Sequence, residues 1–264
     1  MPRVAVPLIA LAAALSGCGG TERESDPGAG GAPPARQSPP AATVVTPSHA
    51  PRCLAGATRS YASDGVAAVL LREATAYRAP GGSPRATFSL HNVNGVRTTF
   101  RVLEARLDRR CAPSWYRVQL PIRPNGAEGW IHADAVRRYR VDFRILVDLS
   151  DRQLTVYRAG EQLVRTPTAI GRPETPTPTG SFYVNQRLLA SDPSGPWGPG
   201  GIGISAFSPT LRHWPQGGPI AIHGTNEPES IGQVASNGCL RIDNAVLQRL
   251  IHLIPDGTPV LVRS

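Results

Sequence analysis

The hydrophobic and polar positions between residues 53 and 140 predict short strands separated by turns. Apolar and polar residues alternate in several segments, which is the period-2 pattern of a strand with one buried face. Turn signals stand between them, at Ala79–Gly82 and at Pro124–Gly126. Strands at this spacing favour a small barrel. The expected strands are Val69–Leu71, Phe100–Ala105, Trp115–Leu120 and Gly129–Ile131.

From residue 143 to the C-terminus the pattern predicts a second strand-rich unit that contains one helix. Ser150–Arg152 separates two apolar segments and indicates a hairpin. The helix is expected to begin at a cap formed by Asp243 or Asn244. Residues 191–201 are rich in Gly, Pro and Ser and should form a long surface loop, of the kind that can act as a lid. The expected strands are Ile145–Leu149, Gln153–Tyr157, Leu163–Val164, Phe182–Val184, Pro219–Ile222 and Pro259–Val262, and the apolar stripe of the helix is Val246, Leu247, Leu250, Ile251 and Ile254.

The first 52 residues are not expected to belong to either unit. An apolar run from Val4 to Leu15 follows Arg3, and it is too short to span a bilayer. The run ends at Leu15-Ser16-Gly17-Cys18, which resembles the cleavage box of bacterial lipoproteins. That resemblance implies a signal peptide over residues 1–17 and a lipid on Cys18, and a plain secretory signal is the alternative. Residues 18–52, rich in Pro, Gly and Ala, should form a disordered tether, or an incidental tail.

Composition narrows the function only slightly. Gly and Pro, at 27 residues each, argue against a helical bundle. The net charge is +9, and all 28 basic residues are Arg. An exported chain rarely meets nucleic acid, and the sequence carries no nucleic-acid-binding motif. Anionic polymers of the cell envelope are therefore the better expected partner, and solubility alone is the simpler explanation.

One pair of residues in the second unit has the chemistry of an acyl-transfer site. His223 ends an expected strand, and Cys239 follows 16 residues later, just before the helix. A thiol close to an imidazole can form a thiolate–imidazolium pair, which is a good nucleophile at neutral pH. The helix N-terminus and Arg241 are expected to favour the anion. The N–H groups of Gly238 and Cys239 can face a developing oxyanion.

The motifs around this pair resemble the L,D-transpeptidase catalytic domain of the YkuD family. The matching strings are Thr177–Gly180, His223–Thr225, Ser230–Gly232 and Ser236–Arg241, and they occur in the family's order. The resemblance covers residues 143 to 263. It implies a β-sandwich-like fold with few helices, so that the whole chain is expected to be mainly β. It also implies a Cys nucleophile that forms a thioester with a peptidoglycan stem peptide, and no cofactor.

The resemblance assigns roles to individual positions. Cys239 is the expected nucleophile and His223 the base, and the backbone carbonyl of Gly224 is expected to orient the imidazole. At one position the chain departs from the family, which usually has His where this sequence has Asn237. That departure puts oxyanion or substrate contacts in doubt rather than the reaction. The oxyanion and substrate positions implied are Gly238, Asn237, Ser236 and Arg241.

The first unit resembles bacterial SH3-like cell-wall modules, which bind peptidoglycan or act as spacers. The resemblance lies in Trp115–Val118 and Gly129–His132. Trp115 and Trp130 are expected to be buried barrel aromatics, and a binding groove is the alternative. Cys53 and Cys111 flank this unit, and in an exported chain they should form a disulfide. They are the pair that remains when Cys18 is lipidated and Cys239 is needed as a thiol.

Together these patterns predict an exported, lipid-anchored enzyme of the cell envelope, facing the periplasm or the wall. Its partners would be peptidoglycan stem peptides and the membrane, not nucleic acid, and its product a 3–3 cross-link. Water as acceptor would make it an L,D-carboxypeptidase, and an amine of another protein would make it a protein-anchoring enzyme.

Three other hypotheses about the function have less support from the sequence. A Cys/His endopeptidase of the papain type has Cys before His, the reverse of the order here. A non-catalytic wall-binding lipoprotein is favoured by Asn237 alone. A zinc site is possible on ligand type, but no pair of its candidate ligands has zinc-like close spacing. Those candidates are His213, His223, His252 and Cys239.

Overall fold

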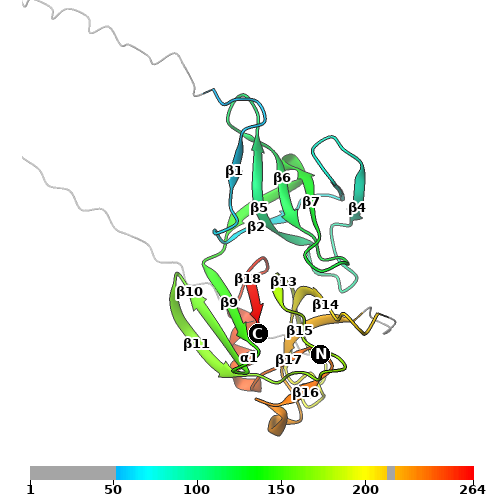
Figure 1. Cartoon of the computed structure of the whole chain (residues 1–264), viewed down its shortest axis with the longest axis vertical. Coiled ribbons are helices and arrows are strands. Elements are labelled where there is room, and N and C mark those ends of the chain that lie inside the picture. The colour runs from blue at the N-terminus through cyan, green and yellow to red at the C-terminus, as the bar shows by residue number, and fades with distance from the viewer. Residues whose placement is uncertain (1–51, 213–217) are drawn as a thin grey trace, which may run out of the picture. The chain divides into compact units, whose positions relative to one another are not determined.

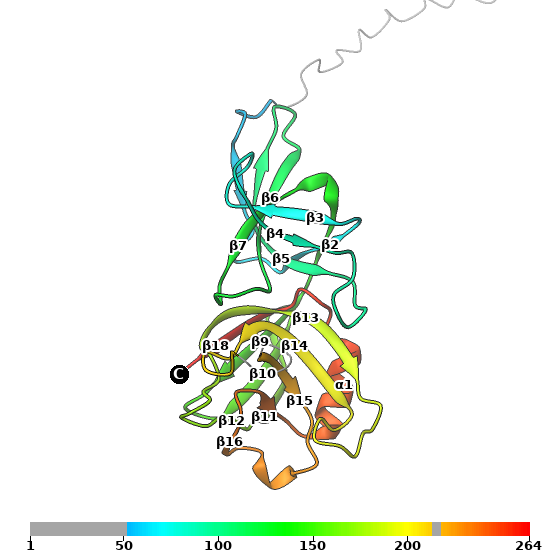
Figure 2. The same cartoon turned by 90° about the vertical axis from the view of Figure 1, so that its right-hand side faces the viewer.

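The computed structural model describes residues 52–212 and 218–264, drawn in colour in Figure 1. The expected signal peptide, Cys18, nearly all of the expected tether and His213 lie outside the described residues. The described chain is mainly β and contains one α-helix (Figures 1 and 2). That helix has ten residues, and no described helix has the length and apolar character needed to cross a bilayer.

Residues 52–140, called here the N-terminal module, form an eight-stranded sheet around one hydrophobic core. The strand order is β4-β3-β7-β6-β5-β2-β8, and β1 pairs with β5. The predicted strands near Phe100 and Trp115 are present, whereas β1, β3, β4 and β8 were not predicted. The strands are β1 (Thr58–Ser60), β2 (Val66–Leu70), β3 (Ala74–Tyr77), β4 (Pro84–Phe88), β5 (Thr99–Leu107), β6 (Pro113–Gln119), β7 (Glu128–His132) and β8 (Val136–Arg140), with a 3-10 turn, η1 (Ala133–Ala135), before β8.

The two tryptophans of this module lie on the outer face of the sheet, so the prediction that they are buried is wrong. Side chains alternate along a strand, and the core positions of β6 and β7 belong to Tyr116 and Ile131. Trp115 and Trp130 are consequently half-buried on the opposite face. The Trp115 ring lies 3.6 Å from that of His132 between ring centroids.

A disulfide joins Cys53 and Cys111, as the sequence predicted, across 58 residues of chain. Closing a loop of this length is worth roughly 4 kcal/mol in the chain-entropy model. We expect a Cys53→Ser, Cys111→Ser double variant to lose up to roughly this much unfolding free energy, measured by urea denaturation. Wild-type protein reduced with dithiothreitol is the control and should match the variant. An unchanged midpoint in both would show that the disulfide does not constrain the unfolded chain.

Residues 141–264, called here the C-terminal domain, contain a second eight-stranded sheet, with the order β11-β10-β9-β18-β13-β14-β15-β17. The predicted hairpin around Ser150 is present as β9 and β10. A separate two-stranded sheet pairs β12 with β16. The strands are β9 (Phe143–Asp148), β10 (Gln153–Arg158), β11 (Glu161–Pro167), β12 (Ile170–Gly171), β13 (Gly180–Leu189), β14 (Gly200–Phe207), β15 (Pro219–His223), β16 (Val234–Ser236), β17 (Leu240–Arg241) and β18 (Pro259–Arg263). A 3-10 turn, η2 (Pro228–Ser230), precedes β16.

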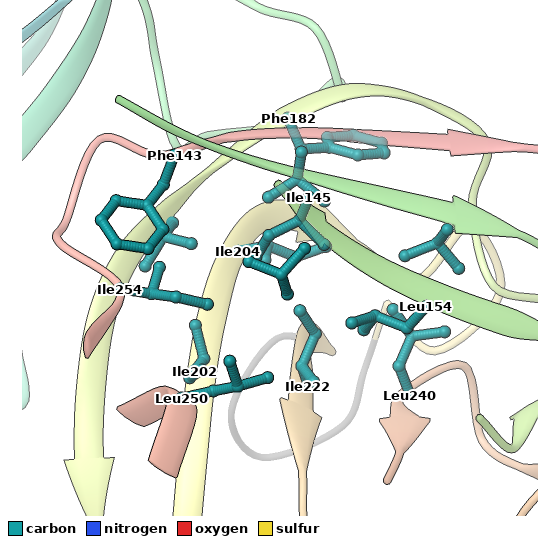
Figure 3. Packing of buried hydrophobic residues seen from close by; sticks show 14 of the residues in the cluster. Phe143, Ile145, Leu154, Phe182, Ile202, Ile204, Ile222, Leu240, Leu250 and Ile254 are labelled. Carbon is teal, nitrogen blue, oxygen red and sulfur yellow. The ribbon is translucent and has the colours of Figure 1, made fainter. Parts of the chain in front are cut away.

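The long sheet folds over itself, which gives the sandwich-like fold that the sequence predicted. The ten-residue strand β13 pairs with β18 through its first half and with β14 through its second half. An irregularity between Val184 and Gln186 lies at this change of partner. Side chains from β9 and β10 meet those from β14, β15 and β17 in one core (Figure 3). The labelled residues of that core are Phe143, Ile145, Leu154, Phe182, Ile202, Ile204, Ile222, Leu240, Leu250 and Ile254.

The α-helix, α1 (Asn244–Leu253), covers one edge of this core, and Asp243 is its cap. The Asp243 carboxylate accepts hydrogen bonds from the backbone N–H groups of Ala245 and Val246, at 2.9 and 3.0 Å. Of the two candidate caps, Asp243 therefore has this role. Asn244 points its side chain elsewhere and takes part in the site described below.

Strand β14 is the largest element that the sequence did not predict. Its first two residues, Gly200 and Gly201, fall within the segment that was expected to be a surface loop. The strand is buried at seven of its eight positions and lies between β13 and β15. Three glycines in eight residues lower the strand propensity, and only neighbouring strands on both sides make this segment extended.

Candidate active site

Strands β15 and β17 bring His223 and Cys239 together. The two strands pair in parallel, with Ile222 opposite Leu240, and both of these side chains enter the core. His223 follows Ile222 and Cys239 precedes Leu240. Because side chains alternate along a strand, the imidazole and the thiol lie on the same side of the sheet, away from the core. The strand pairing thus brings two residues 16 positions apart in sequence to one side of the sheet.

The orientation of the imidazole is set by its own strand end. His223 is 6% exposed, and its Nδ1–H donates a hydrogen bond to the carbonyl oxygen of Gly224 at 2.6 Å. This is the bond that the family resemblance implied. With Nδ1 carrying the proton, Nε2 is the nitrogen that can accept one.

Burial makes both groups neutral in the resting site. It lowers the pKa of His223 to about 4, while the bond to Gly224 raises that pKa and the Arg241 charge lowers it. Burial also raises the pKa of the Cys239 thiol, whereas a hydrogen bond with the Ala221 backbone and the charge of Arg241 lower it. The neutral thiol and imidazole are therefore favoured at rest over the thiolate–imidazolium pair that the two groups can form. Desolvation disfavours each charged form, and the charges that were expected to stabilise the thiolate do not offset it.

Arg241 is held by other groups and does not point freely at the thiol. Its Nη1 donates to a carboxylate oxygen of Glu227 at 2.7 Å and to the hydroxyl of Ser230 at 3.2 Å. These bonds join β17 to the segment that follows His223. The role of Arg241 in the structure is to fix that segment beside the site.

A turn held by two hydroxyl groups presents Cys239. The Ser236 hydroxyl accepts from the Gly238 N–H at 3.1 Å and donates to the Cys239 carbonyl at 2.6 Å. Thr177 links this turn to β12. Its hydroxyl donates to the Gly238 carbonyl at 2.9 Å and accepts from the Gly171 N–H at 2.9 Å. The Gly238 N–H, one of the two expected oxyanion donors, is thus bonded to Ser236 in this structure.

Asn237, the position that departs from the family, is exposed. Its side-chain oxygen accepts a hydrogen bond from Nη1 of Arg172 at 3.4 Å. Arg172 is also exposed and comes from the loop after β12. The pair forms one edge of the site next to Cys239.

Two residues that the sequence analysis did not assign to the site support His223. The Asn244 side chain accepts from the Thr225 N–H at 2.8 Å and donates to the Thr225 carbonyl at 2.9 Å, which fixes the backbone just after Gly224. The ring of Trp197 lies 4.4 Å from the His223 ring between centroids. Asn244 follows the last motif string closely but was considered only as a helix cap, whereas Trp197 comes from a loop distant from the motif strings.

The described residues contain no group of three or more His, Cys, Asp and Glu side chains able to hold a metal ion. Of the four candidate zinc ligands, His252 is exposed in the last turn of α1. His223 has Nδ1 bonded to Gly224. His223 and Cys239 have side chains suited to proton transfer and nucleophilic attack.

Known proteins with related sequences match this part of the chain. The model of the YkuD family, the L,D-transpeptidase catalytic domain, matches residues 142–262. The putative L,D-transpeptidase YkuD of Bacillus subtilis is 33% identical over 124 residues, which are 47% of this chain and 68% of that protein. Its namesake in Bacillus licheniformis is 36% identical over 123 residues, 46% of this chain and 66% of that protein.

Among solved structures, an L,D-transpeptidase of Enterococcus faecium is 26% identical, with a TM-score of 0.34, over 46% of this chain and 50% of that one. The match thus spans two thirds of the curated relatives and about half of the solved chain. By these matches, the chain belongs to the family of proteins with an L,D-transpeptidase catalytic domain.

Proposed function

We propose that this protein is a peptidoglycan L,D-transpeptidase that forms 3–3 cross-links through a thioester on Cys239. The observation that carries the proposal is the buried His223, whose Nδ1–H is bonded to Gly224 while Cys239 lies on the adjacent strand end. This arrangement supports a nucleophile beside a buried base with a fixed tautomer.

In the first step the Cys239 sulfur attacks a carbonyl of the donor stem peptide. This carbonyl belongs to the diamino acid at stem position three, in the amide bond that joins this residue to the terminal D-Ala. The thiol proton moves to Nε2 of His223 as the carbon–sulfur bond forms. His223 then gives this proton to the D-Ala nitrogen, the carbon–nitrogen bond breaks, and D-Ala leaves. The product is a thioester on Cys239.

In the second step an amine of another stem attacks the thioester. His223 takes a proton from this amine and returns it to the sulfur as the carbon–sulfur bond breaks. The result is an amide between two residues at stem position three, and a free thiol. Water in place of the amine gives a shortened stem, which is the L,D-carboxypeptidase outcome.

The oxyanion of each step would lie at the turn that holds Cys239. The backbone N–H of Cys239 is the proposed first donor. The Gly238 N–H joins it once the Ser236 hydroxyl turns away from that group. Preorganised N–H donors of this kind are each worth roughly 10²- to 10³-fold in rate.

The position of Cys239 also argues against a papain-type endopeptidase. That class places its Cys on a helix, whereas Cys239 precedes strand β17 and α1 begins only at Asn244. The remaining enzyme alternatives differ in the acceptor and not in the acyl-enzyme.

We propose further that the chain is exported and anchored through a lipid on Cys18. The lipoprotein-like box at Leu15–Cys18 supports this, and so does the Cys53–Cys111 disulfide, which is typical of proteins outside the reducing cytoplasm. The N-terminal module would then lie between the anchor and the catalytic domain in sequence.

We expect wild-type protein to gain the full mass of a carbapenem after incubation, because thiolate attack opens the lactam ring without losing atoms. Intact mass spectrometry measures the adduct, and the Cys239→Ala variant should show none. With tetrapeptide stems, a cross-linked dimer supports transpeptidation and a tripeptide alone identifies the carboxypeptidase. Wild-type protein that forms neither adduct nor peptide product would refute the proposal.

A further inference from the structure

The segment between β13 and β14 carries an aromatic side chain that the reaction outlined above does not use. Trp197 has its indole ring 4.4 Å from the imidazole ring of His223 between centroids, with 41° between the ring planes. The residue is 43% exposed, whereas His223 is 6% exposed. One part of the indole therefore covers the imidazole, and the rest faces solvent.

The backbone around Trp197 is held by hydrogen bonds on both sides. The Gly198 N–H donates to the Gly195 carbonyl at 2.9 Å, and the Ala190 N–H donates to the Pro199 carbonyl at 3.0 Å. The Gly200 N–H donates to the carbonyl of Trp197 itself at 3.3 Å. The expected surface loop is thus built from hydrogen-bonded turns, and Trp197 has a defined place in it.

Gly198 brings this loop against the residues that support His223. Its φ of 55° is in the left-handed region that favours glycine. A Cβ at this position would lie 2.3 Å from Oδ1 of Asn244 and 2.8 Å from the nitrogen of Thr225. Only glycine lets the chain pass this close, and the close passage places the preceding residue, Trp197, over the imidazole.

We propose that Trp197 is a positioning residue whose indole ring covers the imidazole of His223, restrains its rotation and keeps water from it. Two restraints then define the ring: the Gly224 carbonyl holds Nδ1 from one side, and the indole packs on the ring. This inference deepens the proposed function and rests on it where catalysis is concerned.

The pKa of His223 depends on the groups around it and on its burial beneath the indole ring of Trp197. The charged or titratable groups that face it are Cys239 and Arg241, and Arg241 is bonded to Glu227. Strand β14 contributes Gly201 opposite His223, and α1 contributes Asn244 nearby, both uncharged. Burial is the largest cause of the lowered pKa of His223, so removing the cover should raise that pKa.

The indole also faces the ring when the ring becomes charged. During attack His223 holds the proton of Cys239 and is an imidazolium. A cation against an aromatic face is stabilised electrostatically. Trp197 therefore opposes protonation by solvent through desolvation, and still supports the transient cation during the reaction.

The test compares Trp197→Ala with Trp197→Phe, which keeps an aromatic ring, and with Leu189→Ala, an exposed apolar residue at the end of β13 that lies outside the site. In each full-length variant, NMR follows the pH titration of the His223 imidazole, whose signals are identified by their loss in His223→Gln. Iodoacetamide alkylation of Cys239 gives its pH profile without any stem peptide. Turnover of tetrapeptide stems gives kcat and KM.

We expect Trp197→Ala to raise the His223 pKa by about one unit or more and to move the alkylation profile with it. The kcat of this variant should fall about 10- to 100-fold with KM unchanged, because the imidazole of His223 loses a packing contact whereas substrate binding does not. Trp197→Phe should retain most of the wild-type behaviour, and Leu189→Ala all of it. Shifts in titration and alkylation without any wild-type turnover would support the positioning role and reject the proposed function alone.

Two results would overturn the inference. Wild-type titration and alkylation profiles in Trp197→Ala would show that the indole does not control the imidazole. A raised KM with unchanged kcat and unchanged titration would make Trp197 a substrate contact instead.

Discussion

A His223→Gln variant is expected to fold normally and to lose about 10³-fold in kcat for stem-peptide cross-linking. The imidazole is the proposed proton carrier in both steps, and a glutamine amide cannot accept the thiol proton. The loss should appear as well in acylation by a carbapenem, because the burial-raised pKa of Cys239 leaves little thiolate without a base. Steady-state turnover and the rate of adduct formation measure the two effects.

The same variant provides a structural check through acid stability. Folded His223 has a pKa of about 4, below the ordinary value of about 6.5. Between these pH values the unfolded chain binds a proton that the folded chain does not, so stability falls as the pH falls from 6.5 to 4. This linkage amounts to about 3 kcal/mol in wild type and should vanish in His223→Gln.

The exposed His252, on α1, is the matched control. His252→Gln should keep both kcat and the wild-type slope of unfolding free energy against pH. Normal turnover in His223→Gln would assign the base to another residue. An unchanged slope in that variant would mean that the imidazole is not buried in its neutral form.

Gly224→Ala should lose about 10²-fold in kcat, because a methyl group at this position has no space. A Cβ would lie 2.2 Å from Oδ1 of Asn244, 2.8 Å from Cδ of Pro199 and 3.1 Å from the carbonyl oxygen of Trp197. The chain must move at Gly224, whose carbonyl holds Nδ1 of His223. The displaced imidazole then meets the thiol in the wrong geometry, and turnover measures the loss.

Gly82→Ala, in a turn of the N-terminal module, is a suitable control for this change. Its Cβ would approach neighbouring atoms only to 3.2 Å, and the site is not involved. We expect Gly224→Ala to lower the unfolding free energy by about 1–3 kcal/mol through overpacking, and Gly82→Ala to lower it by less. Wild-type turnover and stability in Gly224→Ala would contradict the tight packing seen around this residue.

Local signals in the sequence predicted much of the framework that carries the site. The hairpin of β9 and β10 was visible because turn residues separate two apolar segments. The helix α1 was visible from its apolar stripe, although the choice between Asp243 and Asn244 as cap was open. The motif strings also identified His223, Gly224 and Cys239. Each of these residues lies within a short string of neighbouring residues, which can be recognised without knowing the fold.

Other features depend on segments that are distant in the chain. Gly-rich β14 has little strand propensity of its own and is extended because β13 and β15 pair with it. Trp115 and Trp130 were expected inside the N-terminal module, but the register of β6 and β7 turns them outward. A one-residue change of register would reverse this, and the sequence pattern alone does not set it.

The amino-acid sequence by itself pointed to the proposed reacting pair, the strand-rich framework and the family. Only the tertiary structure decided the state in which the pair rests. Packing of β15, β17 and the Trp197 loop buries His223, and desolvation favours the neutral forms of His223 and Cys239 over the thiolate–imidazolium pair that they can form. Burial is a property of the folded chain as a whole, because residues far apart in sequence supply the atoms that exclude the solvent.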